Sequence, residues 1–119
     1  MSFEAILRGI VDRCPGCLGV ALMGADGIPI AEQAGARESD EVTLLGVEFG
    51  RVLEEARKVA SIVNGGEMEE LTIAMAKTQV VMRAVDRETF LVLALDHDGN
   101  AGKAKYLLRR ALLDVRELL

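Results

Sequence analysis

Two cysteines lie two residues apart in the stretch Cys14-Pro15-Gly16-Cys17, and no other spacing in the chain is better suited to chemistry. A Cys-X-X-Cys pair can cycle between dithiol and disulfide when its surroundings lower the pKa of one thiol. It can also supply two of the four ligands of a zinc site. The elements on either side of the pair therefore decide between chemistry and packing.

The sequence gives little support to either chemical function. The pair follows a helical pattern and precedes a strand-like one, whereas the thioredoxin arrangement runs from strand to helix. Zinc would need two more ligands, and the chain has no third cysteine and one histidine, His97. We interpret Cys14 and Cys17 as small buried apolar residues. A thiol redox role, or a four-thiolate zinc site shared by two chains, stays open as an alternative.

A second polar stretch, residues 96–100 (DHDGN), resembles the start of a calcium-binding loop. The EF-hand pattern needs glycine at the sixth position and glutamate at the twelfth, where this chain has Ala101 and Leu107. We interpret the stretch as a turn in which Asn100 caps a helix. His97 is also the single candidate base for any nucleophile, and no phosphate-binding glycine loop is present. We expect no enzymatic activity, no metal and no cofactor.

Length and composition predict one domain over residues 1–119, of which half are hydrophobic, with a net charge of -5. Lys and Arg are spread along the helical patterns, which argues against nucleic-acid binding, and three Phe, one Tyr and no Trp leave little for base stacking. The N-terminus does not resemble a signal peptide and the apolar runs are short, so we expect no membrane insertion and a cytoplasmic protein. A disulfide is not expected there.

Hydrophobic periodicity predicts eight elements. They are a helix over 2–13, a hairpin over 17–34 with its turn at Asp26-Gly27, a helix from Ser39 or Asp40 to Val63, strands over 70–76, 79–85 and 90–95, and a helix over 101–119. The last strand is apolar on both faces, which is typical of a central strand. The expected class is α+β, with a five-stranded, mainly antiparallel sheet, helices on both faces and the order αββαβββα.

The long middle helix presents one apolar stripe. Its members are Val42, Leu45, Phe49, Val52, Leu53, Ala56, Val59, Ala60 and Val63. Five strands span about 24 Å, whereas one helix is about 10–12 Å wide. If the two terminal helices share one face of the sheet, the middle helix cannot cover the other face alone. We therefore predict a homodimer in which a second copy of this helix completes the cover.

The hairpin resembles the signature hairpin of the Roadblock family, which includes dynein light chains and bacterial regulators of the MglB-like, gliding-motility type. The matching residues are Pro15, Gly16, Gly19, Asp26, Gly27, Pro29 and Ala31. The order of elements over the rest of the chain matches as well. The resemblance implies a roadblock/profilin-like fold over residues 1–119 and favours a packing role for the two cysteines.

The resemblance also implies a homodimer in which the third strands pair edge to edge and the central helices lie side by side. The interface would consist of Val42, Leu45, Phe49, Val52, Leu71, Thr72, Ile73, Ala74 and Met75. A Ras-like small GTPase would bind the outer side of the central helices. The candidate contacts there are Leu44, Val47, Arg51 and Lys58.

The function implied is that of a non-enzymatic homodimeric regulator or scaffold that binds a Ras-like GTPase and modulates its GTPase cycle. MglB-like members promote GTP hydrolysis without a catalytic arginine of their own, so Arg51 is interpreted as a solvated helix charge. Leu44 and Val47 are stronger indications, because apolar residues off the buried stripe need a partner. They serve equally well as dimer contacts. A dimerisation module without a GTPase partner is the alternative.

Overall fold

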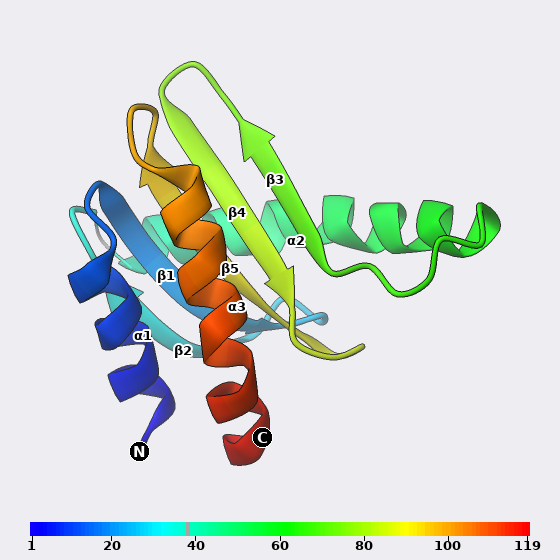
Figure 1. Ribbon diagram of the computed structural model, residues 1–119, viewed down its shortest axis with the longest axis horizontal. Helices are drawn as coiled ribbons and strands as arrows, with labels where there is room; N and C mark the ends of the chain where they lie inside the picture. The colour runs from blue at the N-terminus through cyan, green and yellow to red at the C-terminus, as the bar shows by residue number, and fades with distance from the viewer. Residues whose placement is uncertain (38) are drawn as a thin grey trace.

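The chain folds into a five-stranded antiparallel sheet between two helical layers (Figure 1). The computed structural model describes residues 1–37 and 39–119, with the side chains of all these residues except Ser39 and Asp40. The elements are α1 (Phe3–Arg13), β1 (Cys17–Gly24), β2 (Pro29–Ala34), α2 (Ser39–Ile62), β3 (Glu70–Ala74), β4 (Thr78–Ala84), β5 (Thr89–Asp96) and α3 (Ala101–Leu118). The strands lie in the order β2-β1-β5-β4-β3, and each neighbouring pair is antiparallel. The predicted fold class is confirmed.

The helices divide between the two faces of the sheet, as predicted. In Figure 1, α1 and α3 lie in front of the sheet and α2 crosses behind it. The central strand β5 alternates between two cores. Leu91, Leu93 and Leu95 pack beneath α1 and α3, whereas Phe90, Val92 and Ala94 pack beneath α2. This two-sided burial explains why the strand is apolar at every position.

The first hairpin forms where the sequence predicted it. Gly16 has φ +83°, and the amide of Cys17 donates to the carbonyl of Cys14 at 3.1 Å, so a tight turn joins α1 to β1. Between β1 and β2, Asp26 Oδ1 accepts from the amide of Ile28 at 3.0 Å and Gly27 has φ +87°. The loop covers residues 25–28 and is therefore longer than the two-residue turn that we expected.

Two glycines bring α2 close to the sheet. A Cβ on Gly46 would lie 3.0 Å from Val92 Cγ1, and one on Gly50 would lie 2.9 Å from Phe90 Cζ. The helix ends as predicted, at Asn64 with φ +57° and with the amide of Gly65 donating to the carbonyl of Ala60 at 2.9 Å. Ser39 and Asp40 are the predicted caps at the start of the helix, and their side chains are not among those that the structure describes.

We expected the whole apolar stripe of α2 to be buried, and within one protomer this prediction is wrong for several residues. Val42 and Leu53 are buried, but Val52, Val59 and Val63 are exposed. Val59 and Val63 are exposed because α2 continues past the edge of the sheet beyond β3 (Figure 1), whereas Val52 lies on the flank of the helix beside the buried Leu53. The third strand is also shorter than expected, so that Met75 lies in the turn before β4, where its amide donates to the carbonyl of Thr78 at 2.9 Å.

Candidate partner-binding surface

One flank of α2 carries an apolar seam that the protomer leaves half-covered. Its residues, called the α2 seam, are Leu45, Phe49, Val52, Ala56, Val59 and Val63. Their spacings alternate between four and three, which is the pattern that packs one helix along another. The solvent-exposed fraction is 43% for Val52 and 57% for Val59. The α2 seam is therefore an apolar surface without a full cover.

The sheet ends in an unpaired edge strand close to the part of α2 that extends past it. Strand β3 pairs with β4 on one side and is the last strand of the sheet on the other. Leu71 and Ile73 point towards the α2 side and are half-buried, as part of the core beneath α2. An edge strand exposes a row of backbone donors and acceptors that a second strand can satisfy. The helix seam and the strand edge therefore lie at the same border of the protomer.

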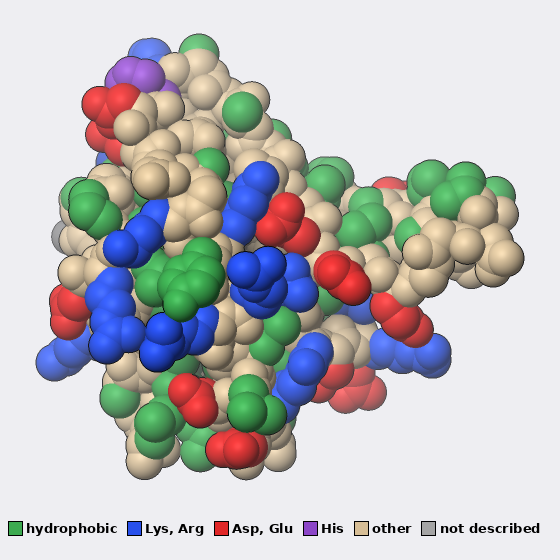
Figure 2. Space-filling model, viewed as in Figure 1, with side chains coloured by type: hydrophobic (Ala, Val, Ile, Leu, Met, Phe, Trp, Pro, Cys, Tyr) green, Lys and Arg blue, Asp and Glu red, His purple; other side chains and the backbone are tan. Residues whose placement is uncertain are grey.

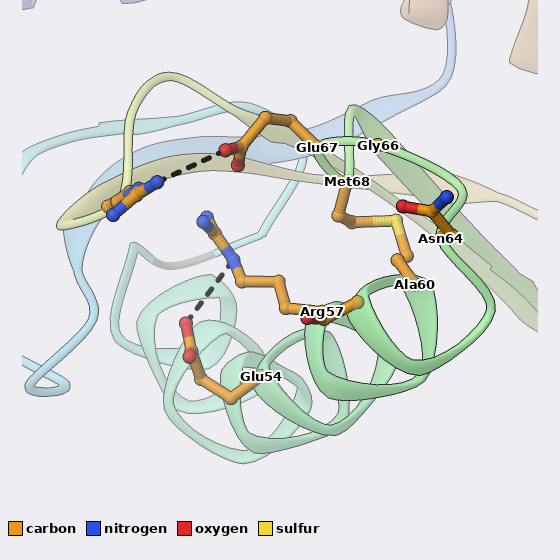
Figure 3. Close-up of a pocket in the computed structure, with 9 residues that line it drawn as sticks. Glu54, Arg57, Ala60, Asn64, Gly66, Glu67 and Met68 are labelled. Atoms are coloured by element: carbon orange, nitrogen blue, oxygen red, sulfur yellow. Dashed lines mark hydrogen bonds and ion pairs between the residues drawn. The ribbon is translucent and has the colours of Figure 1, made fainter.

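Several hollows lie along α2, among them one near each end of the helix. A smaller one of about 230 Å³ is lined by Leu44, Leu45 and Met75 near the start of the helix. A larger one of about 580 Å³ lies between the end of α2, the following loop and the β4–β5 turn (Figure 3). The smaller hollow is apolar and sits beside the α2 seam, so it suits an apolar side chain of a partner.

The larger hollow is built around charged pairs. Arg57 points into it in Figure 3 and donates from Nη2 to the carbonyl of Asp86 at 3.1 Å. Its Nε lies 3.4 Å from Glu54 Oε1 but makes no hydrogen bond. Arg87 pairs with Glu67 at 3.4 Å on the opposite wall. Each arginine is neutralised by its glutamate, the hydrogen bond from Arg57 to Asp86 ties α2 to the β4–β5 turn, and the lining contains no cysteine or histidine.

The structure places the four predicted partner contacts on one side of α2 but in different surroundings. Leu44 is 61% exposed. Val47 is half-buried and packs against the core under α2. Arg51 pairs with Glu48 at 3.6 Å, and Lys58 pairs with Glu55 at 3.1 Å.

The predicted interface residues form two groups. Leu45, Phe49 and Val52 lie on the α2 seam, and Leu71 to Ala74 form β3. Val42 is 1% exposed and packs on its own sheet beneath them.

The most exposed apolar residue of α2 is one of three, Leu44, Val47 and Ile62, that the sequence pattern places outside the apolar stripe. Ile62 is 82% exposed, and Val59 and Val63 beside it are exposed as well. Periodicity placed Val59 and Val63 on the buried stripe because it measures the direction of a side chain and not whether a sheet lies beneath it. An overhang would have been detectable from length, since 24 residues of helix extend about 36 Å, more than the width of the sheet.

The two cysteines are buried beneath α1 and α3. Burial raises the pKa of the Cys14 thiol, and burial together with the neighbouring Cys14 raises the pKa of Cys17 to about 12. Both thiols are therefore protonated at neutral pH, whereas attack on a disulfide and zinc binding need the thiolate. Within the described residues, no metal-binding cluster includes either cysteine. These observations favour the packing interpretation.

The polar turn before α3 acts as a helix cap. Asn100 Oδ1 accepts from the amide of Lys103 at 3.0 Å, as the sequence predicted. Asp96, His97 and Asp98 come close to one another, and His97 Nδ1 lies 3.2 Å from Asp96 Oδ1. All three side chains are at least partly exposed. The described helices include none that is both long and apolar enough for a bilayer.

Taken together, these features describe a small α+β domain with an exposed apolar flank on α2 and an unpaired edge at β3. Comparison with known families gives the class a name. The Roadblock/LC7 domain model matches residues 6–95, and the chain belongs to this family. A comparison with curated protein sequences finds no match.

Solved structures agree with this assignment. A Roadblock/LC7 domain from Streptomyces avermitilis superposes with a TM-score of 0.87 at 15% identity, covering 99% of this chain and 98% of that one. MglC from Myxococcus xanthus is 34% identical over the whole of both chains (100% of each), with a TM-score of 0.72. The gliding protein MglB from Thermus thermophilus gives 0.79 at 16% identity, covering 91% and 81%. The chain thus shares its fold with motility proteins and resembles MglC more closely in sequence than MglB.

Proposed function

We propose that this Roadblock domain is a homodimeric, non-enzymatic regulator that binds a Ras-like small GTPase in the bacterial cytoplasm. The observation that carries the proposal is the coincidence of the α2 seam with the free edge of β3 at one border of the protomer. A two-fold axis at this border would place two α2 helices antiparallel and pair the two β3 strands. One sheet of ten strands would result, without an exposed edge at its centre.

The energetic case for the dimer rests on the overhang. In this arrangement the exposed end of α2, including Val59 and Val63, lies over the partner's sheet, and the partner's helix packs along the α2 seam. Full burial of one such side chain is worth about 1.5–3 kcal/mol, and two-fold symmetry doubles each gain. Val42 supports this layer from below.

The dimer is tested by molar mass in solution. We expect light scattering to give twice the mass of the 12.8 kDa chain at micromolar concentration. The variant Val59→Glu should be a monomer, because it places a carboxylate in an apolar interface. The matched control is Leu113→Glu, on α3 in the opposite layer, since Leu113 is 66% exposed and Val59 57%. A monomeric wild type, or equal effects of the two variants, would contradict the dimer.

The GTPase would bind the outer side of the paired α2 helices. Family resemblance implies this surface, and exposed Leu44 supplies an apolar anchor there. Arg51 and Lys58 are held by glutamates three residues earlier on the same helix. We therefore assign them to orienting the partner rather than to insertion into a nucleotide site. The regulator would act by reshaping the GTPase and would contribute no catalytic group.

Binding of the GTPase is tested by titration calorimetry with the Ras-like GTPases of the same genome, loaded with GDP or a GTP analogue. We expect binding that differs between the two states and weakens at least about tenfold in Leu44→Asp, or about 1.4 kcal/mol. Ile28→Asp is the control, because Ile28 is an equally exposed apolar residue on the β1–β2 loop. Absence of binding in both states would refute the GTPase role while leaving the dimer intact.

A second candidate function follows from the sequence identities. The chain is 34% identical to MglC and 16% identical to MglB, so the MglB-like role receives the weaker support. A dimerisation module or scaffold without a GTPase partner accounts for the same α2 seam and β3 edge. The calorimetric titration distinguishes the two functions, since this candidate predicts a stable dimer that binds none of the GTPases.

A further inference from the structure

The fold separates charge between its two helical layers. Helices α1 and α3 carry seven of the chain's 14 Lys and Arg residues but four of its 19 Asp and Glu residues. The cations are Arg8, Arg13, Lys103, Lys105, Arg109, Arg110 and Arg116. This layer therefore has a formal charge of +3 in a chain of -5. The interpretation that the cations are dispersed is wrong, because folding gathers them on one face (Figure 2).

Two cations of this face have partners, since Lys105 pairs with Glu70 at 3.8 Å and Arg116 donates to the carbonyl of Val85 at 2.9 Å, but others find none within the described chain. On α2, Arg51, Arg57 and Lys58 each pair with a glutamate three residues earlier. Among the described residues, no acidic side chain forms an ion pair with any of four cations of the face, namely Arg13, Lys103, Arg109 and Arg110. Unpaired cations grouped on one surface create a positive potential that attracts anionic groups.

A groove runs between α1 and α3 on the same face, with a volume of about 320 Å³. Its floor is apolar and shallow because small residues line it, including Ala5, Gly9 and Ala111. A Cβ added to Gly9 would meet nothing within 4 Å. Arg13, Arg110 and Asp114 also line it, so apolar residues lie beside two guanidinium groups and one carboxylate.

One arginine of this face is held in place by its own helix. Arg110 donates from Nη1 to the hydroxyl of Tyr106 at 3.0 Å, and the Tyr106 ring is half-exposed. A guanidinium fixed in this way loses less side-chain entropy when it binds a carboxylate, for which its planar fork is suited. Tyr106 adds an amphipathic contact of the kind that is enriched in protein interfaces.

We propose that the face formed by α1 and α3 binds an acidic, amphipathic polypeptide segment of another protein. Carboxylates of the segment would pair with Arg13, Lys103, Arg109 and Arg110, and its apolar side chains would enter the groove. The face lies on the opposite side of the sheet from α2, so it goes beyond the GTPase surface and does not depend on it. A homodimer would present two such faces and could bind a partner twice.

The chemistry of the face favours a polypeptide over other polyanions. Nucleic acid would meet one aromatic side chain, Tyr106, on the exposed side of these helices and a chain of net charge -5. A lipid bilayer cannot follow a groove between two helices, so its headgroups would reach the cations but its surface would leave the apolar lining of the groove uncovered. A peptide with alternating acidic and apolar faces satisfies both the cations and the groove.

The test uses fluorescence anisotropy with a labelled helical peptide that carries glutamates on one face and leucines on the other. We expect Arg109→Glu/Arg110→Glu to weaken binding at least about tenfold, or about 1.4 kcal/mol. The control Lys77→Glu/Arg87→Glu makes the same charge change at exposed turns and should stay within about twofold of wild type. A peptide with serines for leucines should bind more weakly. Circular dichroism and light scattering verify the fold and mass of each variant.

Amide chemical shifts locate the site independently, and we expect the peptide to move resonances of α1 and α3 but not those of α2. Equal binding by the two double variants, or shifts on α2, would overturn the proposal. So would tighter binding of oligothymidine or phosphatidylserine vesicles than of the peptide. Because Arg109 and Arg110 lie on α3, across the sheet from α2, their variant leaves the dimer and GTPase tests unchanged, and failure here is distinguishable from failure there.

Discussion

The cysteine pair shows how surroundings decide the chemistry of a residue. Cys14 ends α1, and Cys17 begins β1 after the turn at Pro15-Gly16, so the pair stands at the carboxyl end of a helix. There the helix dipole disfavours a thiolate. Burial acts in the same direction, because it removes water that would solvate the charge. The residues therefore contribute packing, although their spacing alone is that of a redox or zinc motif.

The raised pKa of Cys17 predicts a loss of stability in alkaline solution. Its ordinary value of 9.0 rises to about 12 in the folded protein because of burial. The unfolded chain thus loses this proton first, and the free energy of unfolding should fall as pH rises from about 9 towards 12. Urea unfolding at a series of pH values measures this slope. Cys17→Ala should reduce the slope, and an unchanged slope would show that Cys17 does not titrate in this way.

Among the elements, α2 has two halves with different roles. The first half lies against the sheet, and Gly46 and Gly50 allow that approach. The last turns extend past the sheet and carry exposed apolar residues, among them Val59 and Ile62 (Figure 1). Glycine lowers helix propensity, so its presence at two contact positions indicates that close packing outweighs the local cost.

Substitution of these glycines separates packing from propensity. Gly50→Ala should destabilise the protein by about 1–3 kcal/mol, because the new methyl group would press on the buried ring of Phe90. Gly9→Ala on α1 is the matched control, since open space surrounds that position. It should stabilise by about 0.5–1 kcal/mol through helix propensity alone. Urea unfolding measures both changes, and equal signs would show that α2 does not approach the sheet this closely.

At the scale of the whole molecule, three surfaces have different characters. The α2 seam and the β3 edge are apolar and unsatisfied, the outer side of α2 carries internally paired charges, and the face of α1 and α3 is basic with an apolar groove. A dimer through the first surface leaves the other two accessible. Such an arrangement suits a regulator or scaffold that holds more than one partner.

If folding and dimerisation are coupled, thermal stability must depend on protein concentration. The midpoint Tm of wild type should rise as concentration increases, because mass action favours the species that binds its partner. Val59→Glu should have a lower Tm that does not change with concentration. Differential scanning calorimetry over a hundredfold range of protein concentration measures the Tm of both proteins. This range corresponds to about 2.7 kcal/mol in association free energy. A wild-type Tm independent of concentration would argue that the protomers do not associate.

Local patterns were sufficient for the elements and their order. Apolar spacing indicated the helices, the two-faced apolar run over 90–95 indicated the central strand, and Pro15-Gly16 and Asn64 marked where helices end. Each signal depends on neighbours within a few residues, so it is readable without the fold. The Roadblock resemblance followed from the same local hairpin.

The tertiary structure decided what lies beneath and beside each element. Periodicity gives the direction in which Val59 and Val63 point, but only the placement of α2 across the sheet shows that the end of this helix extends past the sheet edge (Figure 1). Likewise, Arg13 and Arg110 are nearly a hundred residues apart, and the packing of α1 on α3 brings them to one groove. Whether an apolar side chain is covered, and whether cations cluster, depends on contacts between residues distant in sequence. For this reason the sequence alone determined the helices and strands of this protein, whereas the fold determined its surfaces.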